Sequence, residues 1–442
     1  MLVPLVAFAI LIPMLRVPFD TETASRFITG FMFRGADNIG WAATESVPIG
    51  IFRPLYGATF LLDYRIWGAD QLGYHLTDLI LTWGACAMAF LLFRRRFGVW
   101  TAALGVSLWM LLPAQFQSMF HFYGRNDRIL IYFLLGSLIV YDRVLPDPPG
   151  RRRNGRLLLA GVILSLGLLT KESVFYYGFI LFAWSFMVAG RGFLRTLKED
   201  WPLWATIFAS AAVYFGIRAM LGIRFGDDNQ LDTGLVYLNN LGLILLWGFP
   251  LRLSASVYPW VGGLTIAASA GLLLLRRIPG DVRFGLFCLL AGFLHLPLFW
   301  IQRSFLWIPW LFGALGIAGL TVRILALIRT RWSRTGRVLA VMVPVLLLAS
   351  AGLWSLRECS SWCREPVAVD DAVTWLVNGS PGPEYSGPLA VERLPEFRAA
   401  WEHASRDPGA ENKFWNWVTD LVKIRSGNRN AVVVRESLYG GV

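Results

Sequence analysis

A run of charged side chains, Arg-Asn-Asp-Arg at 125–128, interrupts one of the most apolar parts of the chain. It lies in FHFYGRNDRILIYF (120–133), between apolar segments at 101–113 and 129–140. Ionisable groups at membrane depth are energetically costly, and they commonly mark sites of function. Arginine binds phosphate through two parallel hydrogen bonds, and a carboxylate can take a proton from a hydroxyl. The run therefore indicates an anion site, provided that other elements bring further charges to it.

Further charged residues occur between other apolar segments. Lys171 and Glu172 lie in TKES, between apolar segments at 157–170 and 174–190. Acidic residues also follow the first apolar segment. An outward-facing cavity lined by cations and a carboxylate would suit a substrate with a lipid tail and a phosphate. A structural explanation stays open beside this one, because each charge could instead form an ion pair or reach the headgroup layer from a helix end.

A resident metal ion is not expected. His75, His121 and His295 are far apart in the sequence and lack the spacing of metal ligands. The acidic segment DDNQLD resembles half of a calcium loop, but it lacks the glycine and the final glutamate of the EF-hand pattern. No nucleotide-binding glycine motif or Ser-His-Asp signature stands out.

The composition indicates a polytopic membrane protein. Of the 442 residues, 56% are hydrophobic and 16% are charged, against about 45–50% and about 25% in a soluble domain. The net charge of +12 does not indicate a nucleic-acid partner, because the basic residues concentrate in short loops between apolar segments. This is the distribution of cytoplasmic loops next to anionic lipid. The loops are Arg94–Arg96, Arg143 to Arg156, Arg191 to Lys198, Arg276 to Arg283 and Arg329 to Arg337.

Anchored on these loops, the apolar segments predict an all-α membrane domain over residues 1–356 with about eleven transmembrane helices. A polar stretch at 17–71 becomes the first extracytoplasmic loop. Residues 357–442 differ in composition and predict a small extracytoplasmic α/β domain, in which Cys359 and Cys363 could form a disulfide. Apolar spacing predicts short helices at 366–377 and 411–424, and AVVVRESL predicts a strand. The expected helices lie near 2–16, 72–93, 100–118, 128–142, 157–170, 174–190, 202–221, 257–275, 284–301, 305–327 and 338–356.

Four motifs of this chain resemble those of a known family. They occur in the same order and on the same expected side of the membrane. FRPLYGATFLLDYRIWGADQLGYHLTDLIL (52–81) is similar to an R-P-L, D-Y, W-G and G-x-H-L stretch of transmembrane O-mannosyltransferase-like proteins. Residues 112–133 resemble their G-R-x-D hairpin, 166–175 their L-L-x-K-E hairpin, and 246–260 their L-x-P-x-x-L-S-x-x-Y stretch. The resemblance covers roughly residues 1–330. These relatives are GT-C glycosyltransferases with tetratricopeptide tails, and this chain shows no such repeat.

The resemblance implies an inverting transfer of a sugar from a polyprenyl-phosphate donor on the extracytoplasmic side of the inner or plasma membrane. Asp20 would be the catalytic base, with Glu22 as the second choice. Arg125, Lys171 and Arg53 would bind the donor phosphate. Three supporting roles follow from the same motifs. Asp127 would orient Arg125, Arg128 would anchor the helix at the interface, and Glu172 and His75 would support the site.

Departures from the family leave the sugar and the acceptor open. The family carries His and Glu in the first hairpin where this chain has Leu112, Gln115 and Gln117. The enzyme is therefore expected to transfer a hexose or a pentose to a glycan, lipid or protein hydroxyl. Its expected partners are the lipid-linked donor, the acceptor and membrane lipids, with no certain cofactor and no nucleic acid. The alternatives are a membrane transporter and a lipid-linked glycan flippase or ligase. A transporter is expected to show inverted repeats, and none is apparent.

Overall fold

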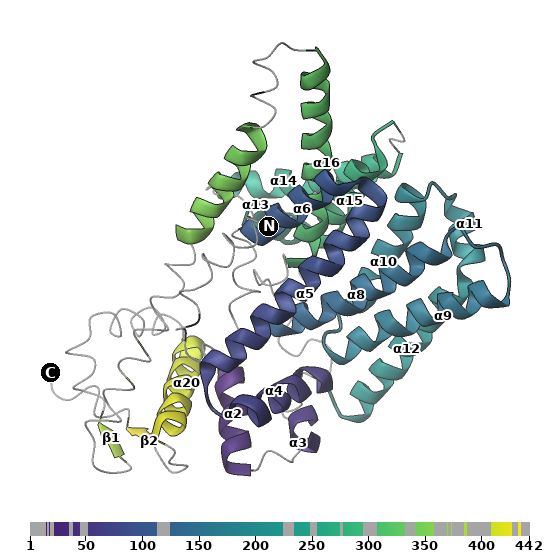
Figure 1. Ribbon diagram of the computed structural model, residues 1–442. Helices are drawn as coiled ribbons and strands as arrows, with labels where there is room; N and C mark the ends of the chain where they lie inside the picture. The colour runs from purple at the N-terminus through teal and green to yellow at the C-terminus, as the bar shows by residue number, and fades with distance from the viewer. Residues whose placement is uncertain are drawn as a thin grey trace.

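The computed structural model describes 17 stretches of the chain, and it is predominantly helical (Figure 1). The described residues are 15, 17, 22–34, 39–44, 52–112, 124–223, 234–247, 254–274, 277–294, 307–331, 338, 342–357, 369, 373, 384–386, 408–426 and 432–434. The α-helices are α2 Glu22–Arg34, α3 Ile39–Thr44, α4 Pro54–Trp67, α5 Gln71–Phe97, α6 Val99–Leu111, α8 Arg125–Val144, α9 Arg151–Leu166, α10 Val174–Ala183, α11 Phe193–Glu199, α12 Trp201–Met220, α13 Gly234–Trp247, α14 Tyr258–Leu274, α15 Gly280–Phe293, α16 Trp307–Arg331 and α20 Pro408–Ser426.

The membrane-protein prediction is confirmed by helix length and composition. In the described ranges, Gln71–Phe97, Trp201–Met220 and Trp307–Ile328 are long and apolar enough to cross a membrane. Shorter apolar helices lie at Val99–Leu111, Val174–Val188 and Met342–Arg357. The total of about eleven stays a prediction.

Local sequence explains where these helices begin and end. The Asp70 carboxylate caps α5 by accepting a hydrogen bond from the Leu72 backbone N–H, at 3.0 Å. Gly98, with a φ of 86°, then turns the chain directly into α6. Pro54 occupies the first turn of α4, where its missing N–H costs nothing.

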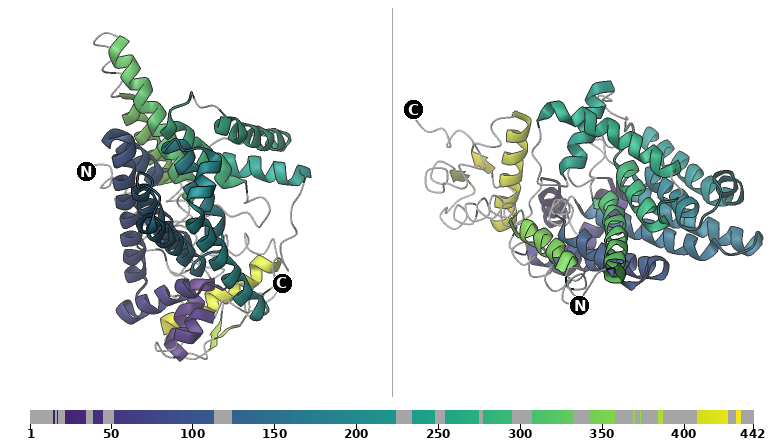
Figure 2. Two further views of the ribbon diagram at one scale, coloured as in Figure 1. Left: turned by 90° about the vertical axis from the view of Figure 1, so that its right-hand side faces the viewer. Right: turned by 90° about the horizontal axis from the view of Figure 1, so that it is seen from above.

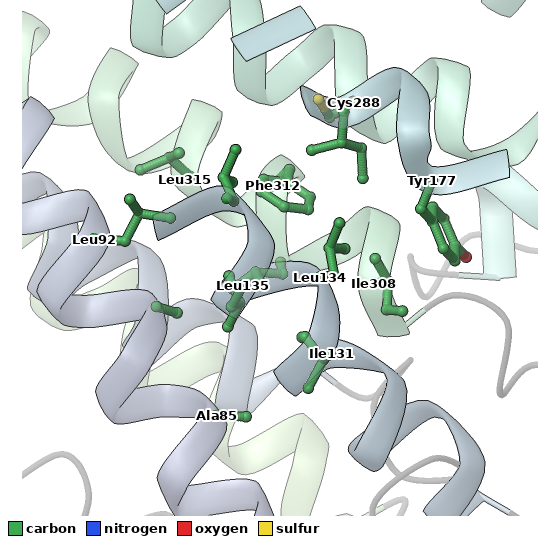
Figure 3. Close-up of a cluster of buried hydrophobic side chains, with 14 of the residues drawn as sticks. Ala85, Leu92, Ile131, Leu134, Leu135, Tyr177, Cys288, Ile308, Phe312 and Leu315 are labelled. Atoms are coloured by element: carbon green, nitrogen blue, oxygen red, sulfur yellow. The ribbon is translucent and has the colours of Figure 1, made fainter. Parts of the chain in front are cut away.

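The main hydrophobic core fills the space between the long helices. It includes side chains of α5, α6, α8, α10, α15 and α16, and Figure 3 shows part of it. Within it, the Trp109 indole donates to the Trp307 carbonyl at 2.9 Å. Helices α15 and α16 approach so closely that a Cβ added to Gly285 would lie 2.4 Å from the Gly316 nitrogen. Such small-residue contacts are typical of helices packed in a membrane.

A second hydrophobic core joins the first outer loop to the C-terminal segment. Phe27 of α2, Tyr56 and Phe60 of α4, and Val418 and Leu421 of α20 are all buried in it. Both views of the molecule place α20 beside α2 (Figures 1 and 2). The first outer loop was expected only as a polar stretch, and its described part instead contains three helices. Because this core includes side chains from both sides of residue 357, the domain boundary there stays a prediction.

Two three-residue strands lie in the C-terminal segment. β1 (Glu384–Ser386) pairs in parallel with β2 (Val432–Val434), with Tyr385 opposite Val433. The strand falls where AVVVRESL predicts one, and α20 covers the helix predicted near 411–424. Cys359 and Cys363 lie outside the described residues.

Two ends of the helical bundle carry buried ion pairs. We call the end with the basic loops Arg94–Arg96 and Arg191 to Lys198 the inner end, and the opposite end the outer end. At the inner end, the buried Asp142 carboxylate accepts from Arg96 and from the Trp184 indole, the latter at 2.9 Å. Three donors meet the buried Asp200 carboxylate, from Arg153, Arg191 and Tyr141. These contacts tie helix ends to the basic loops.

Candidate active site at the outer end

The charged run at residues 125–128 forms the first turn of α8. The helix was expected to begin at residue 128, and it begins at Arg125. The four side chains are buried, and each contacts another element of the outer end. Buried charges require partners of opposite charge or hydrogen bonds, and this turn receives both.

Arg125 is held by two carboxylates from earlier helices. Its Nε lies 2.6 Å from Asp78 Oδ1 of α5, and its Nη1 lies 2.6 Å from Asp63 Oδ2 of α4. Its Nη2 donates to the Tyr74 carbonyl at 3.2 Å. The guanidinium also lies over the Phe60 ring, 4.3 Å from its centre. Arg125 is 0% exposed, so its contacts fix α4, α5 and α8 together.

Arg128 shares a carboxylate with Arg125. Its Nη2 lies 2.8 Å from Asp78 Oδ2, so Asp78 bridges the two arginines. The expectation that Arg128 anchors the helix at the membrane interface is wrong. The side chain is fully buried, because Asp78 supplies inside the protein the countercharge that the headgroup layer would otherwise provide.

Asp127 pairs with the second hairpin. Both of its carboxylate oxygens lie 2.8 Å from Lys171 Nζ, in the turn between α9 and α10. The sequence-based expectation gave Asp127 the role of orienting Arg125. The structure instead directs its carboxylate to Lys171, because the first turn of α8 faces that hairpin while Arg125 turns toward α4 and α5. Lys171 is itself buried.

Asn126 connects the run to the first outer loop. With its amide oriented to satisfy both contacts, it donates to the Thr170 carbonyl at 3.0 Å and accepts from Arg53 Nη1 at 3.2 Å. Arg53 is the residue that precedes α4. The side chain of Asn126 thus links the R-P-L motif to the TKES hairpin.

Glu172 completes the outer end between two arginines. Its Oε2 lies 3.0 Å from Arg53 Nη2, and its Oε1 accepts a hydrogen bond from Arg218 Nη1 in the last turn of α12. The Tyr214 hydroxyl lies 3.4 Å from the same oxygen. Burial raises the pKa of the Glu172 carboxyl, but Arg53 and Arg218 outweigh burial and hold its pKa below the usual value. Glu172 therefore carries its negative charge at neutral pH.

Of the two candidates for the catalytic base, only Glu22 lies within the described residues. Asp20 falls outside them, and Glu22 is the first residue of α2. His75 of α5 is buried, and its Nε2 lies 2.7 Å from the Val17 carbonyl. The contact gives His75 a structural role, since it attaches the chain just before Asp20 to α5.

Metal ligands do not gather in the part of the chain that the structure describes. There, no group of three His, Cys, Asp or Glu residues is placed to hold a metal ion. Sequence reasoning missed three residues of the ionic arrangement, Asp63, Asp78 and Arg218. The signal for Asp78 was present, since a carboxylate inside a long apolar segment requires a cation nearby.

Comparison with known proteins matches the segment that contains most of these charges. Residues 53–217 match the family model described as dolichyl-phosphate-mannose-protein mannosyltransferase. No curated protein matches the chain. The family match confirms the resemblance that the sequence motifs indicated, over the segment from Arg53 to the last turn of α12.

Solved structures share the fold at low sequence identity. The apo oligosaccharyltransferase of Archaeoglobus fulgidus gives a TM-score of 0.50 at 13% identity, covering 94% of this chain and 60% of that chain. The same enzyme tethered to an acceptor peptide with an NVT sequon gives 0.50 at 14% identity, covering 98% and 63%. ArnT from Cupriavidus metallidurans in the apo state gives 0.48 at 14% identity, covering 97% and 77%. The chain thus spans less than two thirds of the archaeal enzyme and shares its fold.

Proposed function

We propose that this protein is an integral membrane glycosyltransferase that moves a sugar from a polyprenyl-phosphate donor to an acceptor hydroxyl. One observation carries the proposal. Most buried charges of the outer end come from separated parts of the segment that matches the mannosyltransferase family, and they meet in one place. Such an arrangement of cations and carboxylates suits a phosphate-bearing substrate and a hydroxyl nucleophile.

The proposed reaction inverts the anomeric centre. Asp20 takes the proton of the acceptor hydroxyl as its oxygen attacks the anomeric carbon from the face opposite the phosphate. The bond between the anomeric carbon and the phosphate oxygen breaks, and polyprenyl phosphate leaves with the electron pair. Glu22 is the second choice for the base. In the sequence, both follow Val17, whose carbonyl contacts His75 of α5.

Cationic residues of the outer end stabilise the negative charge that develops on the departing phosphate. Arg53 is the proposed direct ligand, because its side chain is 10% exposed while that of Arg125 is 0% exposed. Arg125 and Lys171 were predicted as direct ligands too. Their carboxylate partners favour a positioning role, in which they hold α4, α8 and the TKES hairpin around the phosphate.

The orientation in the membrane belongs to the same proposal. The basic loops of the inner end face the cytoplasm, so the outer end faces the extracytoplasmic side of the inner or plasma membrane. About eleven transmembrane helices and a small α/β C-terminal domain complete the proposed architecture. The transferred sugar is a hexose or a pentose, and the acceptor is a glycan, a lipid or a protein.

A donor panel tests the proposal directly. Purified protein in detergent is incubated with polyprenyl phosphates that carry different hexoses and pentoses, together with membrane extract as the acceptor source. Release of free polyprenyl phosphate with one donor, and its absence with the Asp20→Asn variant, supports the transferase. If no donor is cleaved and reconstituted protein instead moves a lipid-linked glycan across liposomes, the protein is a flippase.

A further inference from the structure

We propose that Arg53 and Arg218 form the phosphate site of the lipid-linked donor, and that the Glu172 carboxylate competes with the phosphate for them. This inference rests on the proposed function. It adds Arg218 as a second ligand of the phosphate, and it makes Glu172 the group that the phosphate displaces from the two arginines. The class of ligand is a prenyl phosphate.

The geometry around Glu172 is that of an anion bridging two guanidiniums. Each carboxylate oxygen is held by a different arginine, Oε2 by Arg53 and Oε1 by Arg218. The Tyr214 hydroxyl, 3.4 Å from Oε1, offers a third donor. A phosphate presents oxygens with similar spacing and hydrogen-bond preference, so it can occupy the place of the carboxylate between the same donors.

The two arginines stand at the ends of helices, whereas Glu172 lies in a turn. Arg53 stands at the start of α4 and is held by the amide of Asn126. Arg218 lies in the last turn of α12, with its guanidinium 6.0 Å from the centre of the Tyr214 ring. Glu172 lies in the turn between the short helix at 167–169 and α10. Its side chain can therefore leave the arginines without unwinding a helix.

Solvent exposure separates this cluster from the other cations of the outer end. The Glu172 side chain is 21% exposed, and those of Arg53 and Arg218 are 10% and 7% exposed. Arg125, Arg128 and Lys171 are more deeply buried. A ligand that approaches from solvent therefore reaches Arg53 and Arg218 before it reaches the deeper ion pairs.

Charge explains what the competition accomplishes. The donor is a phosphodiester with one negative charge, the same as the carboxylate that it displaces. The leaving polyprenyl phosphate is a monoester, which carries about −1.5 to −2 at neutral pH. Two guanidiniums hold this product more tightly than the donor, and product release becomes slow. Return of Glu172 to the arginines lowers the apparent affinity for any phosphate held there, so Glu172 promotes release of the product.

Equilibrium binding of a short prenyl phosphate tests the competition without any sugar transfer. Farnesyl phosphate and inorganic phosphate are titrated separately against purified protein in detergent. Glu172→Gln is expected to lower the Kd for farnesyl phosphate on the order of tenfold, and Arg218→Ala to raise it by a similar factor. If inorganic phosphate shows the same dependence, the site recognises the headgroup alone. If only farnesyl phosphate does, the prenyl chain contributes to binding, and both results support the site.

A matched control comes from the inner end. Glu199 also lies between two arginines, Arg191 and Arg195. Glu199→Gln is therefore expected to leave the Kd for farnesyl phosphate unchanged. An unchanged or raised Kd in folded Glu172→Gln would overturn the inference, as would an equal response of the Glu199 variant.

Thermal unfolding covers the case in which Glu172→Gln is unstable. Removing the carboxylate leaves two partly buried cations without that partner, so the unfolding midpoint is expected to fall. Farnesyl phosphate is expected to restore it in Glu172→Gln and to restore it less when Arg218→Ala is added. Failure of this recovery counts against the inference. If these results hold but the donor panel shows no transfer, the binding site stands and the proposed function fails.

Discussion

Buried ion pairs lie at both ends of the bundle, but the most deeply buried charges differ in sign. At the inner end they are carboxylates, with the side chains of Asp142 and Asp200 at 1% and 0% exposure, while Arg95 and Arg96 beside Asp142 are 50% and 30% exposed. At the outer end the arginines of α8 are hidden. The carboxylate of Glu172 is more exposed than either arginine that binds it.

This difference agrees with the proposed division between a topological role and a substrate-binding one. Exposed arginines around hidden carboxylates leave positive charge at the membrane surface, where anionic lipids attract it. Hidden arginines behind a partly exposed carboxylate keep positive charge inside, where a phosphate can reach it only by displacing a side chain. On the proposed function, the inner end would orient the protein and the outer end would hold the chemistry. The following changes test that division, beginning with the largest expected effect.

Removal of the proposed base is expected to have the largest effect. Asp20→Asn keeps the size of the side chain but cannot take the acceptor proton, so the rate of transfer should fall about 10²–10⁴-fold. The release of polyprenyl phosphate under saturating donor measures this rate. Glu22→Gln serves as the comparison and is expected to retain most of it. Full activity of Asp20→Asn together with loss in Glu22→Gln would transfer the role to Glu22.

Removal of one bridging carboxylate at each end is expected to cost similar stability and different activity. Asp78→Ala removes the carboxylate that Arg125 and Arg128 share, and Asp200→Ala removes one that Arg153 and Arg191 share. Each should lower the free energy of unfolding by about 3–5 kcal/mol, because buried charges lose their countercharge.

Denaturation in detergent measures these losses, and donor turnover at low temperature measures activity. Only the Asp78 variant is expected to lose turnover beyond its folded fraction. Equal turnover losses in the two variants would remove the functional distinction between the ends.

Single arginines with different exposure provide the next test. Arg53→Ala removes a proposed phosphate ligand and should raise the KM for the donor about tenfold. Arg95→Ala removes an exposed inner-end charge, 3.7 Å from Asp142, and should leave this KM unchanged. Initial rates over a range of donor concentrations distinguish the two, and a raised KM in the Arg95 variant would argue against a site confined to the outer end.

Acid is expected to produce the smallest effect. The pKa of Glu172 is lowered in the folded protein, so its contribution to stability is complete above the unfolded pKa, near 4.5, and is lost as the pH falls through the folded pKa. Glu172→Gln should therefore flatten the loss of thermal stability below about pH 4.5. An identical pH dependence in the two proteins would mean that Glu172 is not charged in this cluster.

Sequence patterns located the charged residues of the outer end but not their partners. Arg53, Lys171 and Glu172 were expected at that end, and their side chains do lie there. The pairing of Asp127 with Lys171 was missed, because it joins residues 44 positions apart. Such contacts depend on how helices pack, and periodicity along one helix carries no information about it.

Hydropathy also misplaced the start of α8, for a physical reason. Hydropathy treats charged residues as boundaries of a membrane helix, so it placed the first residue of this helix at Arg128. Within the folded protein, Asp63 and Asp78 neutralise this turn, so the helix extends to Arg125. The C-terminal helix α20 was predicted from its apolar spacing, but its packing on α2 was not.

The second hydrophobic core has a consequence for the order in which the protein is made. Phe27 near the beginning of the chain and Val418 near its end are buried in the same cluster. Ribosomes synthesise Phe27 long before Val418, so α2 can pack on α20 only after the intervening membrane helices have been made. The helices that follow Asp20 in the sequence therefore complete their core late. Assembly of this part of the outer end is thus a late step of biogenesis.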